Sequence, residues 1–181
     1  MKRNVDTGIQ FSIPQKPDER TSLRKCLREH FKKEEVDGVQ CNSDACKGRR
    51  GNRERVLSVV VGPEILVIQL VRMAYDIKTG QMTKSMAQVD YSERLNLSRW
   101  SESPLMYQLH GVVAHDGETL DEGHYVAMVR SQSGDTFVHC NDRIIDDTQT
   151  REQVLARADS GDFRSYLLVY QKIRGRMAKC I

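Results

Sequence analysis

The sequence lacks any apolar run of about 20 residues, the length that a membrane-spanning helix needs. Residues 1–15 also lack the apolar core of a secretory signal peptide. The five cysteines are an odd number and form no disulfide framework, so we expect free thiols or a metal-binding pair. These absences exclude membrane proteins and disulfide-rich secreted scaffolds. We therefore expect an intracellular protein of the cytoplasm or nucleus.

A strong excess of one charge is also missing. The net charge is +3 over 181 residues, which is too small to favour nucleic acid or a membrane surface as a partner. The local exception is the basic run Lys47–Arg55, which we expect to be solvated. With 39% hydrophobic and 29% charged residues, the composition is that of a globular domain long enough to bury a core.

Hydrophobic periodicity predicts two helices. In TSLRKCLREHF the apolar residues recur at helical spacing, and Thr21 or Ser22 can cap the helix. In TREQVLARA, Thr150 and Gln153 have the spacing of a capping box. We expect a short second helix there.

The remaining apolar segments predict strands. The run Glu64–Met73 is almost continuously apolar and favours a strand buried on both faces, whereas Gly38–Gly51 is polar and predicts a loop. Four further strands are predicted in MYQLHGVVAH, HYVAMVR, DTFVHCN and YLLVYQKI. A helix followed by mainly hairpin-linked strands indicates an α+β fold with a mainly antiparallel sheet.

The segment HYVAMVRSQSGDTFVHCN predicts a hairpin that holds a candidate catalytic pair. If Arg130 pairs with Asp135 across the four-residue loop SQSG, His124 stands directly opposite Asn141. A slip of one residue would pair His124 with Asp142 instead. Either partner offers an oxygen to one imidazole N–H, which leaves the other ring nitrogen free as a base. The pair would thus supply the His and the Asn of a Cys–His–Asn catalytic triad. The alternative is a surface pair with no catalytic role.

The segment that precedes this histidine in the sequence is polar. HDGETLDEG, residues 115–123, leads directly into His124 and has the character of a loop that gates a substrate. Gly123 allows the backbone to come close to the imidazole. Both features favour the catalytic interpretation of the hairpin.

Several segments resemble one known family. YQLHGVVAHDGETLDEGHYVAMVRSQSGDTFVHCNDRIID, followed by YLLVY, is similar to a C-terminal histidine box. PEILVIQLVRM resembles the central strand of that family, VDYSERLNLSRW the segment after it, and TSLRKCLREHFKKEEVDG the helix before its fingers. CNSDAC lies where the second zinc-binding cysteine pair occurs. From about Thr21 to Tyr170, the chain resembles the ubiquitin-specific proteases, which are papain-like deubiquitinases.

The resemblance implies a papain-like cysteine proteinase fold. Residues 1–173 would be part of a catalytic domain, with a helix and finger-like loop at 21–62 and a palm sheet with the histidine box at 63–173. Residues 174–181 would be a tail. The N-terminal subdomain that carries the cysteine box has no counterpart in these residues.

The resemblance also implies roles for individual residues. His124 would be the general base, Asn141 its orienting residue, and Asp142 an adjacent carboxylate that assists. Residues 116–123, from Asp116 to Gly123, would form a loop over the ubiquitin C-terminal tail, and Tyr125 would line the channel for the paired glycines of that tail. Ubiquitin and ubiquitinated proteins would be the partners, in thiol-dependent hydrolysis of isopeptide bonds.

A nucleophile for this reaction is not evident. The family's cysteine lies in a Gly-rich segment at a helix N-terminus, where its thiol pKa is lowered, and no such segment occurs here. Cys26 lies on the apolar helix face, and Cys140 should point away from the face of Asn141. Cys180 lies in the tail. We expect the isolated chain to be inactive, and the alternative is a non-catalytic ubiquitin-binding scaffold.

The loop cysteines raise the question of a metal. Cys41 and Cys46 are separated by four residues, and a second pair is missing, whereas a structural zinc uses four ligands. We expect no cofactor, with zinc at these two cysteines as the alternative. A third hypothesis is a basic zinc-ribbon-like nucleic-acid binder that uses the same cysteines and Lys47–Arg55. The histidine box argues against this hypothesis.

Overall fold

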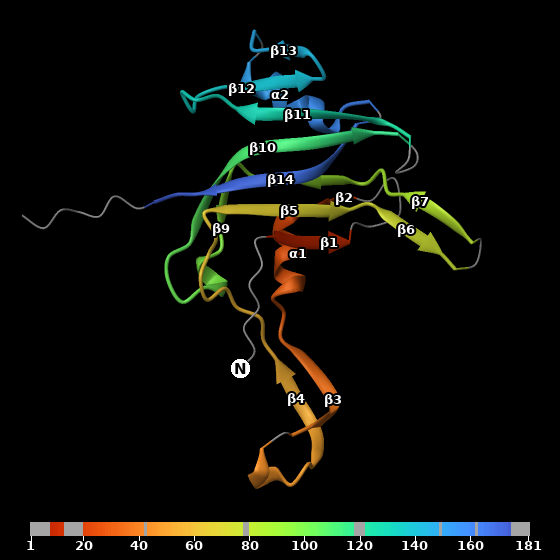
Figure 1. The fold of residues 1–181 in the computed structure, drawn as a ribbon, viewed down its shortest axis with the longest axis vertical. Coiled ribbons are helices and arrows are strands. Elements are labelled where there is room, and N and C mark those ends of the chain that lie inside the picture. Colours follow the sequence, from red (N-terminus) through yellow and green to blue (C-terminus); the bar gives the residue numbers. More distant parts are fainter. Residues whose placement is uncertain are drawn as a thin grey trace, which may run out of the picture.

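The computed structural model describes residues 8–12, 20–41, 43–77, 80–117, 122–148, 150–161 and 163–174. An eight-stranded sheet forms the centre of the molecule, with strand order β1-β5-β14-β10-β11-β12-β13 and β9 beside β10 (Figure 1). Among the described strands of this sheet, only β1 and β5 pair in parallel. The expected α+β fold with a mainly antiparallel sheet is therefore confirmed. Among the described residues, no helix is long and apolar enough to span a membrane.

The elements follow one another in this order. The strands are β1 (Gly8–Ser12), β2 (Arg20–Ser22), β3 (Glu34–Gln40), β4 (Arg50–Arg55), β5 (Ile65–Val71), β6 (Met73–Asp76), β7 (Gln81–Lys84), β8 (Gln88–Asp90), β9 (Arg94–Asn96), β10 (Met106–Asp116), β11 (His124–Arg130), β12 (Phe137–Asn141), β13 (Ile144–Asp146) and β14 (Arg164–Lys172). The helices are α1 (Leu23–His30) and α2 (Arg151–Ala156), with 3₁₀ turns at Asp44–Cys46, Ser98–Trp100 and Arg157–Asp159.

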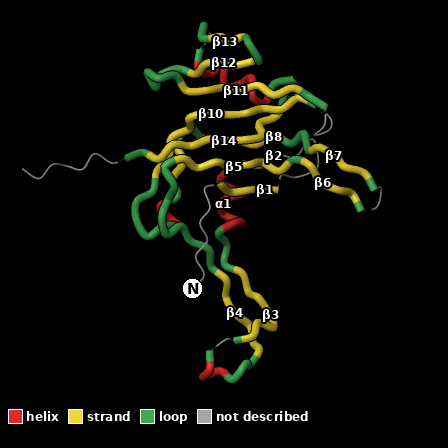
Figure 2. Tube along the Cα trace, viewed as in Figure 1, coloured by secondary structure: helices red, strands yellow, loops and turns green. Residues whose placement is uncertain are grey.

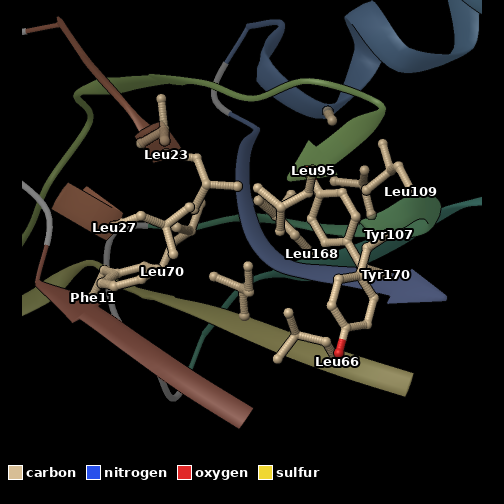
Figure 3. Close-up of a cluster of buried hydrophobic side chains, with 14 of the residues drawn as sticks. Phe11, Leu23, Leu27, Leu66, Leu70, Leu95, Tyr107, Leu109, Leu168 and Tyr170 are labelled. Carbon is tan, nitrogen blue, oxygen red and sulfur yellow. The ribbon is translucent and has the colours of Figure 1, made fainter. Parts of the chain in front are cut away.

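Helix α1 begins where the sequence predicts. Ser22, rather than Thr21, is its N-cap, and the Ser22 side chain accepts a hydrogen bond from the Lys25 amide at 3.2 Å. Leu23 and Leu27 are buried and join the side chains of the sheet in one hydrophobic cluster (Figure 3). The helix thus covers one face of the sheet at its β1–β5 end.

Strand β5 is buried on one face only, so the expectation of burial on both faces is wrong. Leu66, Ile68 and Leu70 point into the core. On the opposite face Gln69 donates a hydrogen bond to the hydroxyl of Tyr166 at 2.7 Å, and this face is only half-buried. The apolar run suggested two covered faces, but the helices of the described chain lie on one side.

The predicted polar loop at Gly38–Gly51 is confirmed in its middle, where residues 41 and 43–49 form turns and no strand, whereas its two ends belong to the strands of a two-stranded ribbon. Strands β3 and β4 pair antiparallel and project away from the sheet (Figure 2). Charged pairs across the ribbon, Arg55–Glu34 and Lys33–Glu54, each lie at 2.5 Å. Because both faces of the ribbon are solvated, it has no apolar alternation from which a strand could be predicted.

The hairpin of β11 and β12 forms, but its register differs from the predicted one by two residues. Arg130 pairs with Phe137 rather than Asp135, and the Ser131 amide bonds the Thr136 carbonyl at 2.9 Å. The four-residue loop is therefore 132–135. A shift of two keeps every side chain on its predicted face, whereas a shift of one would have reversed them. His124 becomes a diagonal neighbour of Asn141 instead of standing directly opposite it.

Helix α2 carries the predicted capping box. The Thr150 amide donates to Gln153 Oε1 at 2.9 Å, and the Gln153 amide donates to Thr150 Oγ1 at 3.3 Å. Val154 is fully buried, so the short helix closes the core beside β12.

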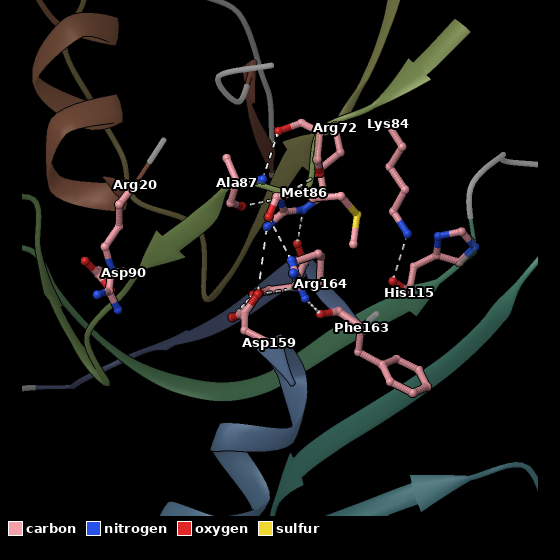
Figure 4. Close-up of polar contacts among 12 residues, drawn as sticks. Arg20, Arg72, Lys84, Met86, Ala87, Asp90, His115, Asp159, Phe163 and Arg164 are labelled. Atoms are coloured by element: carbon pink, nitrogen blue, oxygen red, sulfur yellow. Dashed lines mark hydrogen bonds and ion pairs between the residues drawn. The ribbon is translucent and has the colours of Figure 1, made fainter. Parts of the chain in front are cut away.

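One buried guanidinium connects distant parts of the fold (Figure 4). Arg72 is 2% exposed and donates to the carbonyls of Ser165 at 2.7 Å, Ala87 at 2.7 Å and Ser85 at 3.2 Å. Asp159 lies 3.9 Å from its third nitrogen. Burial lowers the pKa of Arg72 to about 10, so the side chain stays charged at neutral pH.

We expect Arg72→Met to destabilise the fold by about 3–5 kcal/mol, because three buried carbonyls lose their donor and Asp159 loses its counter-charge. Urea unfolding followed by circular dichroism measures this. Arg174→Ala is the control: its ion pair with Glu64 is exposed, and we expect a loss below about 1 kcal/mol. Equal losses in the two variants would contradict the role given to Arg72.

Candidate active site

The structure brings His124 and Asn141 into contact. His124 opens β11 and Asn141 ends β12, and the distance from His124 Nε2 to Asn141 Oδ1 is 2.6 Å. Val126 and Met128, which alternate with His124 along β11, are buried, so the imidazole is on the core side of the sheet at its edge. Both side chains are half-buried. The predicted pair therefore forms in spite of the shifted register.

This contact decides the tautomer of the imidazole. A carboxamide oxygen can only accept, so Nε2 of His124 carries the hydrogen and donates it to Asn141 Oδ1. Nδ1 of the neutral ring then holds a free lone pair. A group held in this way can take a proton from a nearby acid through Nδ1 while Asn141 keeps the ring in place.

Gly123 has the most crowded Cβ position in the described part of the loop before His124. Its φ is +150°, and a Cβ on it would lie 2.2 Å from the Asp116 carbonyl and 2.4 Å from His115 Nε2. Asp116, the last residue of β10, pairs with His124. The backbone of the loop thus closes directly against the start of β11. Residues 118–121 of the predicted loop lie outside the described residues.

Tyr125 lies on the open face of the sheet. It is 46% exposed and packs against His115 at a ring separation of 4.4 Å and against Tyr166 at 6.2 Å. Burial lowers the pKa of His115, and nearby Lys84 acts in the same direction. His115 is therefore a neutral packing side chain at neutral pH, and Tyr125 is the exposed aromatic residue of this strand end.

Two residues that the sequence did not single out help to hold the site. Lys84, at the end of β7, donates to the carbonyls of His115 at 3.1 Å and Gly117 at 2.6 Å, and so fixes the base of the loop. The ring of Phe163 meets the His124 imidazole edge-on at 6.4 Å. Neither residue stands in a recognisable pattern, because each reaches the site from a distant strand end.

Asp142 does not join the pair. It occupies the turn between β12 and β13 with φ of 51°, a conformation that Asp tolerates better than most residues, and it is exposed. Within the described residues it makes no hydrogen bond or ion pair. The alternative register that paired it with His124 is therefore wrong, and its assisting role stays a prediction.

None of the described cysteines is hydrogen-bonded to His124. Cys140 stands opposite Ala127 on the other face from Asn141, as predicted. Cys26 lies in α1, where burial raises the pKa of its thiol. Cys41 and Cys46 are at the tip of the β3–β4 ribbon, at the far end of the molecule from β11 (Figure 1). Cys180 lies outside the described residues.

The ribbon cysteines do not complete a metal site. The described part of the chain contains no group of three or more His, Cys, Asp or Glu side chains that could hold an ion. Cys41 and Cys46 supply two of the four ligands that a closed zinc site uses, so the donor set does not fit such a site.

Comparison with known proteins identifies close similarities. A family model described as ubiquitin carboxyl-terminal hydrolase matches residues 11–170. Ubiquitin carboxyl-terminal hydrolase 48 of Rattus norvegicus is 32% identical over 122 residues, which are 64% of this chain and 12% of that protein. Ubiquitin carboxyl-terminal hydrolase 25 of Arabidopsis thaliana is 30% identical over 166 residues, 87% of this chain and 23% of that protein. The chain thus spans less than a quarter of these two relatives.

Solved structures share the fold. A SAGA DUB module of Ubp8, Sgf11, Sus1 and Sgf73 bound to monoubiquitin matches with a TM-score of 0.69 and 24% identity, covering 91% of this chain and 35% of that one. The same module bound to ubiquitin aldehyde matches with a TM-score of 0.70, 23% identity and the same coverage. At these identities the likeness shows the fold, which agrees with the expected papain-like architecture.

We expect Gly123→Ala to destabilise the fold by about 2–4 kcal/mol, since it adds backbone strain and a clash with the Asp116 carbonyl. Gly134→Ala is a matched control, because Gly134 also has positive φ, at +83°, but has open space around its Cβ position. Its cost should be about 1 kcal/mol. Chemical denaturation measures the free energy of unfolding of both variants. If Gly123→Ala loses no more stability than Gly134→Ala, the Cβ position of Gly123 is not crowded in the way described.

Proposed function

Because the chain belongs to the ubiquitin carboxyl-terminal hydrolase family, we propose that it acts in thiol-dependent hydrolysis of ubiquitin C-terminal isopeptide bonds. The observation that carries the proposal is the 2.6 Å contact between His124 Nε2 and Asn141 Oδ1. It supplies the base and the orienting group that a cysteine hydrolase needs. The substrates would be ubiquitinated proteins of the cytoplasm or nucleus.

In the proposed reaction His124 works through Nδ1. This nitrogen takes the proton of the attacking thiol and later gives it to the departing lysine amine, while Nε2–H stays bonded to Asn141. The thioester that forms is then hydrolysed by water, which the same nitrogen deprotonates. Asn141 supplies orientation without net charge, so the imidazole can cycle between its neutral and protonated forms.

The proposed path of the ubiquitin tail runs along the start of β11. Tyr125 is the exposed aromatic residue there, and Gly123 and Asp116 form the narrow backbone approach to His124. The solved relatives are described as bound to monoubiquitin and ubiquitin aldehyde, which supports ubiquitin as the ligand of this chain as well. We propose no resident cofactor.

We infer that the four described cysteines do not supply the nucleophile. None of them forms a contact with His124 in the described part of the chain, and Cys140 is on the opposite face of the sheet. These 181 residues alone would then bind ubiquitin without hydrolysing it. This observation also favours a second candidate function, a ubiquitin-binding scaffold in which no thiol ever reaches His124.

Titration with ubiquitin and a ubiquitin–aminocoumarin assay test the proposal. We expect saturable binding, no turnover, and weaker binding of ubiquitin that lacks its last two glycines. Tyr125→Ala should weaken binding by roughly tenfold, or about 1.4 kcal/mol. Val129→Ala, exposed on the same face of the same strand, should leave binding unchanged. Absence of binding contradicts the function, and turnover abolished by His124→Ala shows that the chain contains its own nucleophile.

The tautomer of His124 provides a test that needs no activity. Nitrogen-edited NMR should show the Nε2–H form, and Asn141→Leu should lower its ratio to the Nδ1–H form by about fivefold, since one hydrogen bond contributes about 1 kcal/mol. Cys140→Ser, on the neighbouring residue but the opposite face, should leave the ratio unchanged. An unchanged ratio in Asn141→Leu would remove Asn141 from its orienting role.

A further inference from the structure

The outer part of the β3–β4 ribbon concentrates the positive charge of the chain. Residues 40–53, which we call the basic tip, contain four basic residues and one acidic residue, a net charge of +3. The whole chain has 28 Lys and Arg against 25 Asp and Glu, so the residues outside the tip balance to zero. A net charge that is small over the whole chain is therefore a strong local charge in the ribbon. The four cations are Lys47, Arg49, Arg50 and Arg53.

These four cations are available to a partner. All four residues are exposed, and within the described residues none of them makes an ion pair. The charges nearer the sheet differ, because Arg55 pairs with Glu34 and Lys33 pairs with Glu54 across the ribbon. The ribbon projects away from the sheet, so a large partner can reach its tip (Figure 2).

The composition of the basic tip favours a nucleic acid over an acidic protein surface. Residues 40–53 contain no aromatic residue and no aliphatic residue larger than Ala45. The centre of a protein–protein interface uses apolar and aromatic anchors, which the tip lacks. Phosphate groups need only exposed cations. Arginine, which supplies three of the four cations, binds phosphate through paired N–H groups.

The shape of the ribbon favours duplex DNA among the nucleic acids. Proteins hold unpaired bases by stacking them on aromatic side chains, and the basic tip has none. The major groove of duplex RNA is too deep and narrow for side chains to read. B-form DNA has a major groove about 12 Å wide, which accepts a two-stranded ribbon with strands about 4.8 Å apart. Strands β3 and β4 form such a ribbon.

We propose that the basic tip binds duplex DNA through its phosphates, without selecting a base sequence. Each of the four cations contacts a phosphate and releases the counterions that were condensed there. The tip has no large apolar group to pack against bases, so charge supplies the attraction. The proposal does not depend on the deubiquitinase function, because it uses neither His124 nor a ubiquitin ligand. It needs no metal, because neither Cys41 nor Cys46 takes part.

Fluorescence anisotropy of a labelled DNA duplex, titrated with the full chain at several salt concentrations, tests the proposal. The slope of log affinity against log salt is about −0.9 for each phosphate contact, so four contacts predict a roughly hundredfold loss between about 50 and 200 mM salt. The double variant Arg49→Gln and Arg50→Gln should bind at least about tenfold more weakly at the lowest salt, with a slope shallower by about 2.

The matched control is the double variant Arg94→Gln and Arg99→Gln. It removes the same charge from two exposed arginines outside the ribbon, which make no ion pair within the described residues. We expect its affinity and slope to match those of the parent. Equal weakening by the two double variants would overturn the proposal, because the attraction would then come from the overall charge.

Two further results would also overturn it. One is the absence of duplex binding at the lowest salt. The other is tighter binding of a polyglutamate peptide or of phosphatidylserine vesicles than of the duplex, which would assign the basic tip to an acidic protein or to a membrane surface.

Discussion

The guanidinium of Arg72 joins three segments that are distant in the sequence. By donating to the carbonyls of Ser85, Ala87 and Ser165, it fixes the connection after β7 against the start of β14. Such a buried charge is tolerated because Nε and Nη1 donate to carbonyls and Asp159 lies beside Nη2. The ordering of the segment around Ser165 also places Phe163 against His124. The packing around the imidazole therefore depends on an arginine more than fifty residues away in the sequence.

The candidate site is assembled from strand ends. The imidazole comes from the start of β11 and its acceptor from the end of β12, while the loop before His124 is held by Lys84 from β7. Antiparallel pairing brings the start of β11 and the end of β12 to one side of the sheet, where polar groups can face a ligand without disturbing the core. The rigid sheet thus provides the fixed geometry that a base and its orienting group require.

The β3–β4 ribbon is stabilised by other interactions than the sheet. It buries almost no apolar side chains, and its stability comes from backbone pairing and from charged pairs across the strands. Its tip contains Cys41 and Cys46, and it lies at the opposite end of the molecule from β11 (Figure 1).

Local patterns in the sequence determined the helix caps, the antiparallel α+β class and the shared face of His124 and Asn141, because each depends on neighbours within a turn or a hairpin. The exact register was decided by a loop at 132–135 rather than 131–134, a choice that loop composition alone does not make. Only the tertiary structure showed that β5 has one open face, that the ends of Gly38–Gly51 belong to a two-stranded ribbon, and that Lys84 and Phe163 reach the site. These features depend on which distant segments pack together, and no local pattern of residues records that.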